Sequence, residues 1–455
     1  MARGQRRDPQ PLYPISSSAE ILTRFCRARD GVVRYALEPA YLDLLKKLGN
    51  PQKKLPPIIH VAGTNGKGSV CAFLRAMLEA AGYRVHIYTS PHLVRFHERI
   101  RIAGELISED ELVEILSDCE RLADRGQVSD FEVATAAAFV AFARHKADAV
   151  ILETGMGGRL DATNVIEKPA ASIITRLSFD HCKYLGDSMA SIAREKAGIM
   201  RADTPCFAAA QPQEEALAVL RTVAAEKNTP LAVGGVDWQV ERHANTFRFN
   251  DKNRTLDLPL PSLIGPHQLN NAGLAIAALA ALPFPVPVAA IAQGLQKAEW
   301  PARLQKISQG VLADRFPLSW ELWLDGGHND SAGEVLAAQA EIWRRENPEK
   351  LLTLVFGMLS TKDPRAFLAP LAPYVEKLCT VAIPDEALTF SAAELAMQAR
   401  AAGMEKATPA KNITEALRDL TRPPGMAGRI LICGSLYLAG HVLRQNAEGR
   451  YQKTD

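Results

Sequence analysis

The sequence has almost no charge imbalance. Its 455 residues contain 53 Lys and Arg against 51 Asp and Glu, which leaves a formal net charge of +2. A protein that binds nucleic acid by neutralising phosphates usually has a clear basic excess, so we expect no nucleic-acid partner. Apolar residues make up 47% and charged residues 23% of the chain, as in ordinary globular proteins, which excludes a disordered or collagen-like chain.

Cysteines are few and scattered, and none forms a C-x-x-C motif. This spacing supports neither a zinc knuckle nor a disulfide framework, and it favours a reducing compartment. Arg3, Arg6 and Arg7 are followed by DPQPLYP instead of an apolar run, so we expect no signal peptide and a cytoplasmic protein. The seven cysteines are at positions 26, 71, 119, 182, 206, 379 and 433.

One uncharged stretch is long enough to cross a bilayer. Residues 272–292 contain no charged residue over 21 positions, and about 20 apolar residues span the hydrocarbon core. Pro283, Pro285 and Pro287 interrupt the stretch, however, and proline breaks a helix. We therefore expect a buried helix, a turn and a second helix, and no membrane partner.

The length and the pattern of secondary structure predict two domains. A domain usually has about 100–200 residues, so 455 residues are too many for one. Residues 58–210 alternate short apolar runs with helical patterns, which is typical of a parallel sheet with helices on both faces. Residues 231–260 alternate as β-strands do and predict a small antiparallel insertion. A second α/β pattern starts after Trp300-Pro301, so we expect domains at 1–299 and 300–455.

Individual elements follow from the same patterns. Gly82 ends a helix that begins at Lys67, and Ser108 with Glu111 predicts a capping box for a helix that runs toward Arg125. The other expected helices in the first domain are 131–146 and 189–197. The expected strands are 58–62, 85–88, 149–152, 171–175 and 205–209, and then strands near 321–325, 351–356, 377–382 and 429–433.

A glycine-rich loop, Gly63 to Ser69 (GTNGKGS), follows an expected strand and opens a helix. Phosphate binding needs inward-pointing backbone N–H groups, glycines that allow close approach, and a lysine for the β- and γ-phosphates. All are present, with Ser69 as a hydroxyl ligand near Mg²⁺. The loop is shorter than the usual G-x-x-x-x-G-K-[ST], because Gly68 separates Lys67 from Ser69. The alternative is a plain glycine-rich turn.

Three further groups of residues carry weaker signals. Glu153 ends an expected strand, where open α/β sheets place their ligands, and a carboxylate suits Mg²⁺. The Gly-x-Gly-Gly run at 155–158 fits a plain turn better when taken alone. His181 is, by itself, more often a structural histidine, and Lys196 before Gly198 resembles a solvated cation at a helix end.

The order of the motifs resembles the Mur ligase superfamily and, within it, the folylpolyglutamate synthase and dihydrofolate synthase family. The resemblance covers roughly residues 20–445, so coincidence is negligible. The motifs are GTNGKGS, TSPHL (89–93), ETGMGGRLDATN (153–164), DHCKYLG (180–186), EKAGI (195–199), GPHQLNNA (265–272), WPARLQ (300–305), LDGGHN (324–329), FGMLSTKDP (356–364) and GSLYLAG (434–440).

The resemblance implies an α/β fold with two parts. The first is an N-terminal ATPase-like domain with a phosphate-binding loop, a mainly parallel sheet and a small antiparallel insertion. The second is a C-terminal Rossmann-like α/β domain that carries the glutamate-ligase function. It also implies a chemistry: a carboxylate attacks the γ-phosphoryl group of ATP, and the glutamate amine then attacks the resulting acyl phosphate. Catalysis is then mainly positioning and neutralisation of spread negative charge.

The resemblance assigns a role to each position that matches a family motif. Lys67, Lys196 and His181 match the catalytic positions, and two Mg²⁺ sites are implied. ATP would contact Asn65, Gly66, Lys67, Gly68, Ser69, Asn271, Arg303 and Asp325. One Mg²⁺ would be held by Ser69, Ser90 and Glu153, and the second by His181 and by Lys196 if that lysine is carbamylated. The pterin would lie near Phe131, Glu132, Thr135, Leu160 and Asp161, and glutamate near His328 and Ser360.

One alternative and three departures qualify these expectations. Phe131 and Thr135 also fit the core of an amphipathic helix. The family's early D-x-G-L-x-R segment reads RYALEP at 34–39, WPGR reads WPAR, and DxAHNP reads DGGHND at 325–330. The first departure lies in the folate-binding region, which leaves substrate preference open.

The implied activity is therefore an ATP-dependent ligase that adds L-glutamate to dihydropteroate and further glutamates to reduced folates. A monofunctional polyglutamate or dihydrofolate synthase is the alternative within the family. A Mur-type cell-wall ligase is less favoured, because RLDATN and GSLYLAG argue against it. A P-loop kinase or NTPase switch would not require Glu153, His181 and Lys196 in one order. The family implies a monomer.

Overall fold

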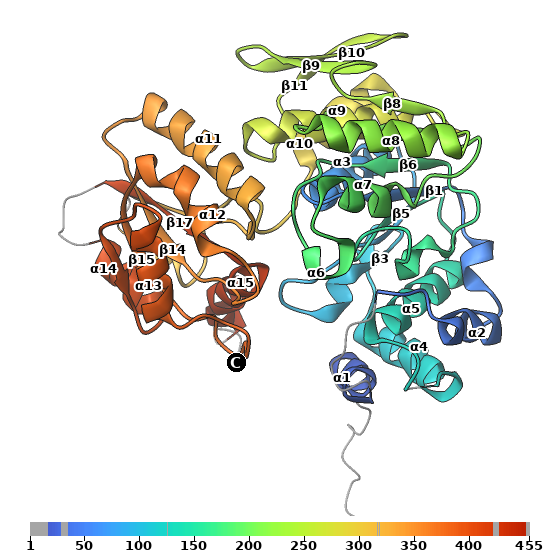
Figure 1. The fold of residues 1–455 in the computed structure, drawn as a ribbon, viewed down its shortest axis with the longest axis horizontal. Helices are drawn as coiled ribbons and strands as arrows, with labels where there is room; N and C mark the ends of the chain where they lie inside the picture. Colours follow the sequence, from blue (N-terminus) through green and yellow to red (C-terminus); the bar gives the residue numbers. More distant parts are fainter. Residues whose placement is uncertain are drawn as a thin grey trace, which may run out of the picture.

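Two separate sheets organise the chain (Figure 1). The computed structural model describes residues 17–28, 35–124, 126–315, 317, 319–421 and 427–451. The N-terminal sheet has eight strands in the order β4-β3-β2-β5-β1-β6-β7-β8. Its parallel strands are β1 (Ile58–Ala62), β2 (Val85–Tyr88), β5 (Ala149–Glu153), β6 (Ala171–Ile174), β7 (Cys206–Ala208) and β8 (Leu231–Val233), and its antiparallel edge is β3 (Ile100–Ile102) and β4 (Glu105–Leu106).

Helices cover both faces of the N-terminal sheet. Successive side chains of a strand point to opposite faces, so Ile59 and Val61 belong to one apolar cluster and Ile58 to another. The first cluster is closed by α3 (Lys67–Ala80), α9 (Pro266–Leu279) and α10 (Val288–Lys297), and the second by α1 (Ser18–Ala28), α2 (Pro39–Lys47), α4 (Glu109–Leu122) and α5 (Asp130–Arg144). Helices α7 (Met189–Ala197) and α8 (Glu214–Glu226) pack on the β6–β8 side.

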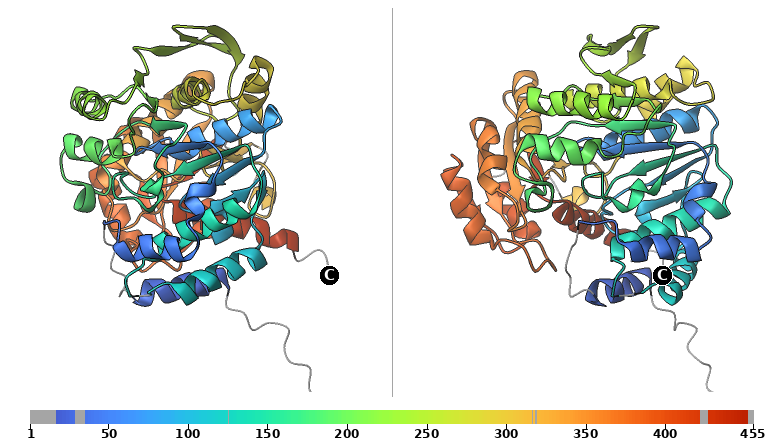
Figure 2. Two further views of the ribbon diagram at one scale, coloured as in Figure 1. Left: turned by 90° about the vertical axis from the view of Figure 1, so that its right-hand side faces the viewer. Right: turned by 45° about the vertical axis from the view of Figure 1, so that its right-hand side comes forward.

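A three-stranded antiparallel sheet lies on α9, apart from the main sheet (Figure 2). Its strands are β9 (Trp238–Arg242), β10 (Thr246–Asp251) and β11 (Thr255–Pro259). Gly273 of α9 permits the contact, because a Cβ there would lie 2.5 Å from a methyl group of Val240. The antiparallel insertion is thus confirmed, but it is smaller than expected, since β8 pairs in parallel with β7 and belongs to the main sheet.

The C-terminal sheet has six strands in the order β12-β13-β17-β14-β15-β16, and only β12 is antiparallel. Apolar residues of β13 alternate between two clusters, with Leu322 on one face and Trp323 on the other. The strands are β12 (Gln305–Ile307), β13 (Trp320–Leu324), β14 (Leu351–Phe356), β15 (Val375–Thr380), β16 (Ala407–Pro409) and β17 (Gly428–Cys433). The helices are α11 (Asp330–Glu346), α12 (Pro364–Leu368), α13 (Ala392–Ala401), α14 (Ile413–Leu420) and α15 (Leu436–Tyr451).

The α/β fold expected from the sequence is confirmed, with small differences at the element ends. Ser108 caps α4 by accepting a 3.2 Å hydrogen bond from the Glu111 amide, but the Glu111 carboxylate contacts His145 Nε2 at 2.8 Å and does not complete the expected capping box. That helix ends at Leu122, and Arg125 lies outside the described residues. The sequence patterns did not predict the short edge strands or the helices α1, α2 and α8. Residues 272–292 form most of α9, a turn and the start of α10, and no helix in the described part of the chain is long and apolar enough to cross a membrane.

Candidate active site

The glycine-rich loop lies at the carboxyl end of β1, where parallel strands place ligands. Gly63 and Gly66 have φ angles of +144° and +93°, which L side chains rarely adopt. A Cβ on Gly63 would lie 1.8 Å from Thr175 Oγ1, and one on Gly66 would lie 2.6 Å from Asn271 Oδ1. The Nζ atom of Lys67 folds back to donate to the carbonyl of Gly63 at 3.2 Å. The loop is therefore a tight backbone cradle with its cation already turned inward.

A chain of hydrogen bonds brings α9 to this loop. Gln268 Nε2 donates to the buried hydroxyl of Ser69 at 3.2 Å, and Asn271 Nδ2 donates to Gln268 Oε1 at 3.0 Å. On the other side, Gly68 packs against the ring of Trp300, which a Cβ would approach to 2.6 Å. The structure thus brings Ser69 and Asn271, two residues expected at the nucleotide, to one side of the loop.

Glu153 ends β5 and is only 4% exposed. Its Oε2 accepts a 3.2 Å hydrogen bond from the backbone amide of Ser90. Burial raises the pKa of Glu153, and the charges of Lys67 and Arg303 partly offset that rise. Because a buried carboxylate is costly without a cation, this position suits a bound metal ion.

The donor set at Glu153 fits magnesium. The Glu153 carboxylate and the loop that carries Ser90 meet at this edge of the sheet, and Ser69 is buried at the start of α3, which follows the neighbouring strand β1. Within the described ranges, no group of three or more His, Cys, Asp or Glu side chains could hold a metal ion. Mg²⁺ prefers oxygen ligands and usually binds through one or two carboxylates plus phosphates and waters. A single carboxylate with hydroxyls therefore matches Mg²⁺ brought in with a nucleotide.

Lys196 lies in the last turn of α7 and is 4% exposed. Its Nζ donates to the carbonyl oxygen of Gly63 at 3.0 Å. Burial, together with the nearby charge of Lys67, lowers the pKa of Lys196 to about 7, although Asp180 and Asp161 act in the opposite direction. A large fraction of this amine is therefore neutral at neutral pH, which is the form that can react with an electrophile.

His181 has a φ angle of +53° and precedes the single turn α6 (Cys182–Leu185). Desolvation lowers its pKa to about 4, with further lowering by Lys362 and Lys196 and an opposing effect of Asp180. The imidazole is consequently neutral at physiological pH and keeps a lone pair for a ligand.

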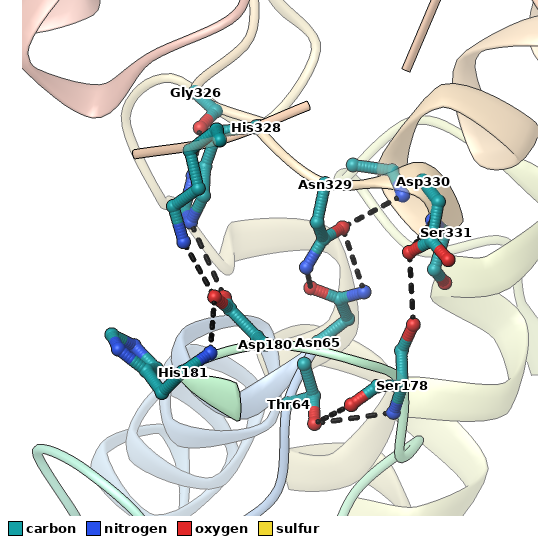
Figure 3. Close-up of polar contacts among 12 residues, drawn as sticks. Thr64, Asn65, Ser178, Asp180, His181, Gly326, His328, Asn329, Asp330 and Ser331 are labelled. Carbon is teal, nitrogen blue, oxygen red and sulfur yellow. Dashed lines mark hydrogen bonds and ion pairs between the residues drawn. The ribbon is translucent and has the colours of Figure 1, made fainter. Parts of the chain in front are cut away.

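Asp180, between β6 and α6, contacts residues of the C-terminal half of the chain (Figure 3). The ammonium group of Lys362 forms an ion pair with its Oδ1, and His328 Nε2 lies 3.7 Å from its Oδ2. The backbone amide of His181 also donates to Oδ1 at 2.8 Å. Although burial opposes it, the neighbouring His328, His181 and Lys362 together hold the pKa of Asp180 well below its usual range. Asp180 and Lys362 were not among the expected site residues, although they lie in the DHCKYLG and FGMLSTKDP motifs.

A second contact between the sheets involves the phosphate loop itself. The side-chain amides of Asn65 and Asn329 donate to each other, both at 3.2 Å (Figure 3). Beside them, Ser178 Oγ donates to Asp330 Oδ1 at 3.1 Å. Asn329 and Asp330 were also missed as site residues, although both lie in the LDGGHND segment. Asn65 is thus bound to the C-terminal half by its own side chain.

Arg303 and Asp325 lie where the C-terminal half begins. Both oxygens of the buried Asp325 carboxylate accept backbone hydrogen bonds, from Gly327 at 2.7 Å and Leu304 at 2.8 Å. Burial raises the pKa of Asp325, and Arg303 opposes the rise. Ala302, which stands where the family has glycine, has a φ angle of +56°. Asp325 therefore shapes the segment that carries Arg303.

The residues expected at the pterin are held mainly by their own neighbours. Glu132 closes a capping box with Ser129, accepting from its amide and hydroxyl at 2.8 Å. Thr135 Oγ1 donates to the carbonyl of Phe131 at 2.7 Å. The phenyl ring of Phe131 covers Gly155, whose Cβ would lie 2.3 Å from it. Of these three residues, Phe131 directs an apolar ring at the loop after β5, whereas Glu132 and Thr135 are engaged in hydrogen bonds.

Asp161 folds the same loop from within. Its Oδ2 accepts from the Met156 amide at 2.8 Å, and its Oδ1 accepts from the amide and hydroxyl of Thr163 at 3.0 and 2.6 Å. Burial raises the pKa of Asp161, while the hydrogen bonds from Thr163 lower it. Leu160, beside it, is partly exposed. The exposed Ser360 donates its hydroxyl proton to Leu388 at 3.1 Å and not to the cluster at Asp180.

The segment that departs from the family pattern is partly described. Arg34 lies outside the described residues. Tyr35 donates a 2.7 Å hydrogen bond to Glu195 Oε2 and accepts one from the Gly158 amide at 3.3 Å. Tyr35 therefore connects this segment to the loop after β5 and to α7.

Comparison with known proteins assigns the class first. Residues 61–279 match the model of the Mur ligase middle domain, and residues 316–445 match that of the dihydrofolate synthetase C-terminal domain. The fold is therefore that of a Mur ligase.

Relatives over the full length define the family. A dihydrofolate synthase/folylpolyglutamate synthase of Bacillus subtilis is 32% identical over 440 residues, covering 91% of this chain and 96% of the relative. One from Escherichia coli is 33% identical over 441 residues, covering 96% and 97%. The structure of E. coli FolC in complex with DHPP and ADP matches with a TM-score of 0.85 at 31% identity, covering 96% and 99%. The chain belongs to the dihydrofolate synthase/folylpolyglutamate synthase family.

Proposed function

We propose that this chain is an ATP-dependent ligase that adds L-glutamate to dihydropteroate and further glutamates to reduced folates. The observation that carries the proposal is one buried site in which the phosphate loop, Glu153 and Lys196 meet at the carboxyl edge of the N-terminal sheet. The C-terminal half reaches this site through Asn329 and Lys362. A relative from Yersinia pestis, matched at a TM-score of 0.82 and 32% identity over 96% of this chain, was solved with AMPPNP and Mn ion, which supports a nucleotide and a divalent metal here.

The phosphate loop would bind ATP between the two halves of the chain. Backbone amides of Gly66 to Ser69 and the ammonium of Lys67 would hold the phosphates, and Asn271, Arg303 and Asp325 would contact the nucleotide from the other side. The substrate carboxylate then attacks the γ-phosphorus, the bond to the β-phosphate oxygen breaks, and ADP leaves. Arg303 and Lys67 neutralise the charge that spreads over the transferred group.

The second step forms the amide. The neutral amine of glutamate attacks the acyl carbon, a tetrahedral intermediate collapses, phosphate leaves with the C–O bond electrons, and the nitrogen loses a proton. Lys362 and His328 lie beside Asp180, where they would bind the carboxylates of glutamate. We keep Ser360 as a glutamate contact, two residues from Lys362. Phe131, Glu132, Thr135, Leu160 and Asp161 would border the pterin.

Two magnesium sites complete the proposal. Ser69, Ser90 and Glu153 would hold the first Mg²⁺, and His181 with a carbamylated Lys196 would hold the second. Magnesium held at these positions would supply positive charge against the phosphates. The buried, partly neutral amine of Lys196 favours carbamylation, because an uncharged amine adds CO₂ and, on losing one proton to solvent, becomes a carbamate with anionic oxygen atoms.

The proposal also covers the cellular location, the domain boundary and the oligomeric state. All seven cysteines are free, which supports a reducing, cytoplasmic location. We propose a domain boundary at 299/300, between α10 and β12, and a monomer.

The decisive experiment measures glutamate-dependent release of ADP with dihydropteroate and with tetrahydrofolate offered separately. Release with both substrates establishes the bifunctional ligase, and release with one alone establishes the corresponding monofunctional enzyme. Release with neither overturns the folate assignment. Omitting glutamate is the control for background ATP hydrolysis.

A further inference from the structure

The loop that carries Ser90 has one end at the candidate metal site. Residues 89–99 leave β2 at the carboxyl edge of the N-terminal sheet, and the Ser90 amide donates to Glu153 Oε2 at 3.2 Å. We refer to residues 89–99 as the serine loop. Any movement of this loop changes the position of Ser90 relative to the Glu153 carboxylate.

The middle of the serine loop is held in place by the carboxylate of Glu98. Glu98 accepts hydrogen bonds from three successive backbone amides, those of Leu93 at 2.8 Å, Val94 at 3.1 Å and Arg95 at 2.8 Å. Successive N–H groups that converge in this way form an anion-binding concavity, and Glu98 fills it. The turn at 93–95 is therefore held in one shape and moves as a unit.

The far side of the serine loop lies on the C-terminal half. The side chain of Leu93 packs against the apolar cluster that includes Leu438 and Val442 of α15. Gly440, on the same helix, permits this approach, because a Cβ there would lie 1.9 Å from the carbonyl oxygen of Leu93. Figure 1 shows α15 beside the segment that follows β2. Leu93 is thus an N-terminal residue seated in a C-terminal core.

We infer that Leu93, seated on Gly440, is a positioning residue that couples the placement of the C-terminal half to Ser90 and to the metal site at Glu153. Three residues of chain extend at most about 10 Å, so the clamped turn at Leu93 cannot shift far without moving Ser90. The inference rests on the proposed function for the role of the metal. The contact itself does not depend on which folate is the substrate.

The test compares Leu93→Ala and Gly440→Ala with two controls. Leu93→Met keeps an apolar side chain of similar volume. Leu443→Ala truncates a side chain of α15 that packs on the same cluster. The first readout is Mn²⁺ affinity in the presence of a non-hydrolysable ATP analogue, measured from the electron paramagnetic resonance signal of free Mn²⁺. The second is hydrogen exchange of the Ser90 amide.

We expect Leu93→Ala and Gly440→Ala to weaken Mn²⁺ binding roughly 3- to 30-fold, the range typical of coupling through packed contacts, and to speed exchange at Ser90. Leu93→Met and Leu443→Ala should bind Mn²⁺ as the unmodified chain does, even if Leu443→Ala melts at a lower temperature. Unchanged Mn²⁺ affinity and Ser90 exchange in both test variants would overturn the coupling. Absence of glutamate-dependent ADP release from the unmodified chain would instead overturn the proposed function, and the binding readout would still decide the coupling.

Discussion

Two neighbouring regions differ in how their charged side chains are paired. We call the loop after β1 together with Lys196 the phosphate side, and the loop after β5 together with Glu132 the pterin side, after their proposed ligands. On the phosphate side, Lys67 and Lys196 direct their ammonium groups at backbone carbonyls. On the pterin side, Glu132 and Asp161 accept several short hydrogen bonds from their own neighbours. Buried charges without a charged partner are costly. The phosphate side therefore depends on its ligands, whereas the pterin side is stable by itself.

The strongest test of this comparison replaces Glu153 with glutamine. Glu153→Gln keeps the shape but removes the charge that would face Mg²⁺, so glutamate-dependent ADP release should fall roughly 10²- to 10³-fold, as for loss of one electrostatic group in an active site. The melting temperature without Mg²⁺ should be unchanged or higher, because burial raises the pKa of this carboxyl. If Glu153→Gln kept its activity but melted at a lower temperature, the carboxylate would serve stability and not ligand binding, which contradicts the comparison.

Lys196→Ala should cost somewhat less activity, roughly 10- to 100-fold, the usual effect of losing a group that supports a metal site. An added small carboxylate such as acetate should restore part of the rate, because it can occupy the space of a carbamate. Lys196→Arg is the control, since it keeps a cation and cannot be carbamylated in the same way. Full activity of Lys196→Ala would contradict its assignment.

Asp161→Ala should act mainly on stability. The variant leaves the amides of Met156 and Thr163 and the Thr163 hydroxyl without their acceptor, and each lost bond to a charged group costs about 1.5–3 kcal/mol. We expect a lower urea midpoint and a smaller loss of kcat than for Glu153→Gln. Unchanged stability with a large rise in KM for the folate would place Asp161 at the ligand instead.

The smallest expected effect is on the pH dependence of stability. The folded chain releases the Lys196 proton at about pH 7, whereas the unfolded chain keeps it up to about 10.5. Between these values the unfolded state binds more protons, so the free energy of unfolding should rise with pH through this residue. Urea unfolding of the unmodified chain and of Lys196→Met, from pH 7 to pH 9 in CO₂-free buffer, should show a shallower slope for the variant. Equal slopes would refute the lowered pKa.

The sequence was most informative where function and local structure coincide. Residues 63–69 follow β1 and open α3 as expected, because the glycines, the lysine and the flanking apolar runs all act within a few residues. The pterin side was harder to interpret. The pattern S-x-x-E at 129–132 is a capping box, so the same glutamate fits both a helix start and a ligand contact.

The contacts between the two halves could not be predicted. Asn65 and Asn329 are 264 residues apart in the chain, and no local propensity relates them. The same holds for Asp180 with Lys362 and for Leu93 with Gly440. Their pairing depends on how the N-terminal and C-terminal halves of the chain pack against each other.

The sequence alone determined the α/β class, the glycine-rich loop after β1 and the family, since each depends on short-range patterns and their order. Only the tertiary structure decided that the amine of Lys196 is buried beside Lys67, which lowers its pKa to about 7. It also decided which polar side chains are already occupied by neighbours. Burial and partner choice are properties of the packed chain, because desolvation and hydrogen-bond geometry arise only when distant segments meet.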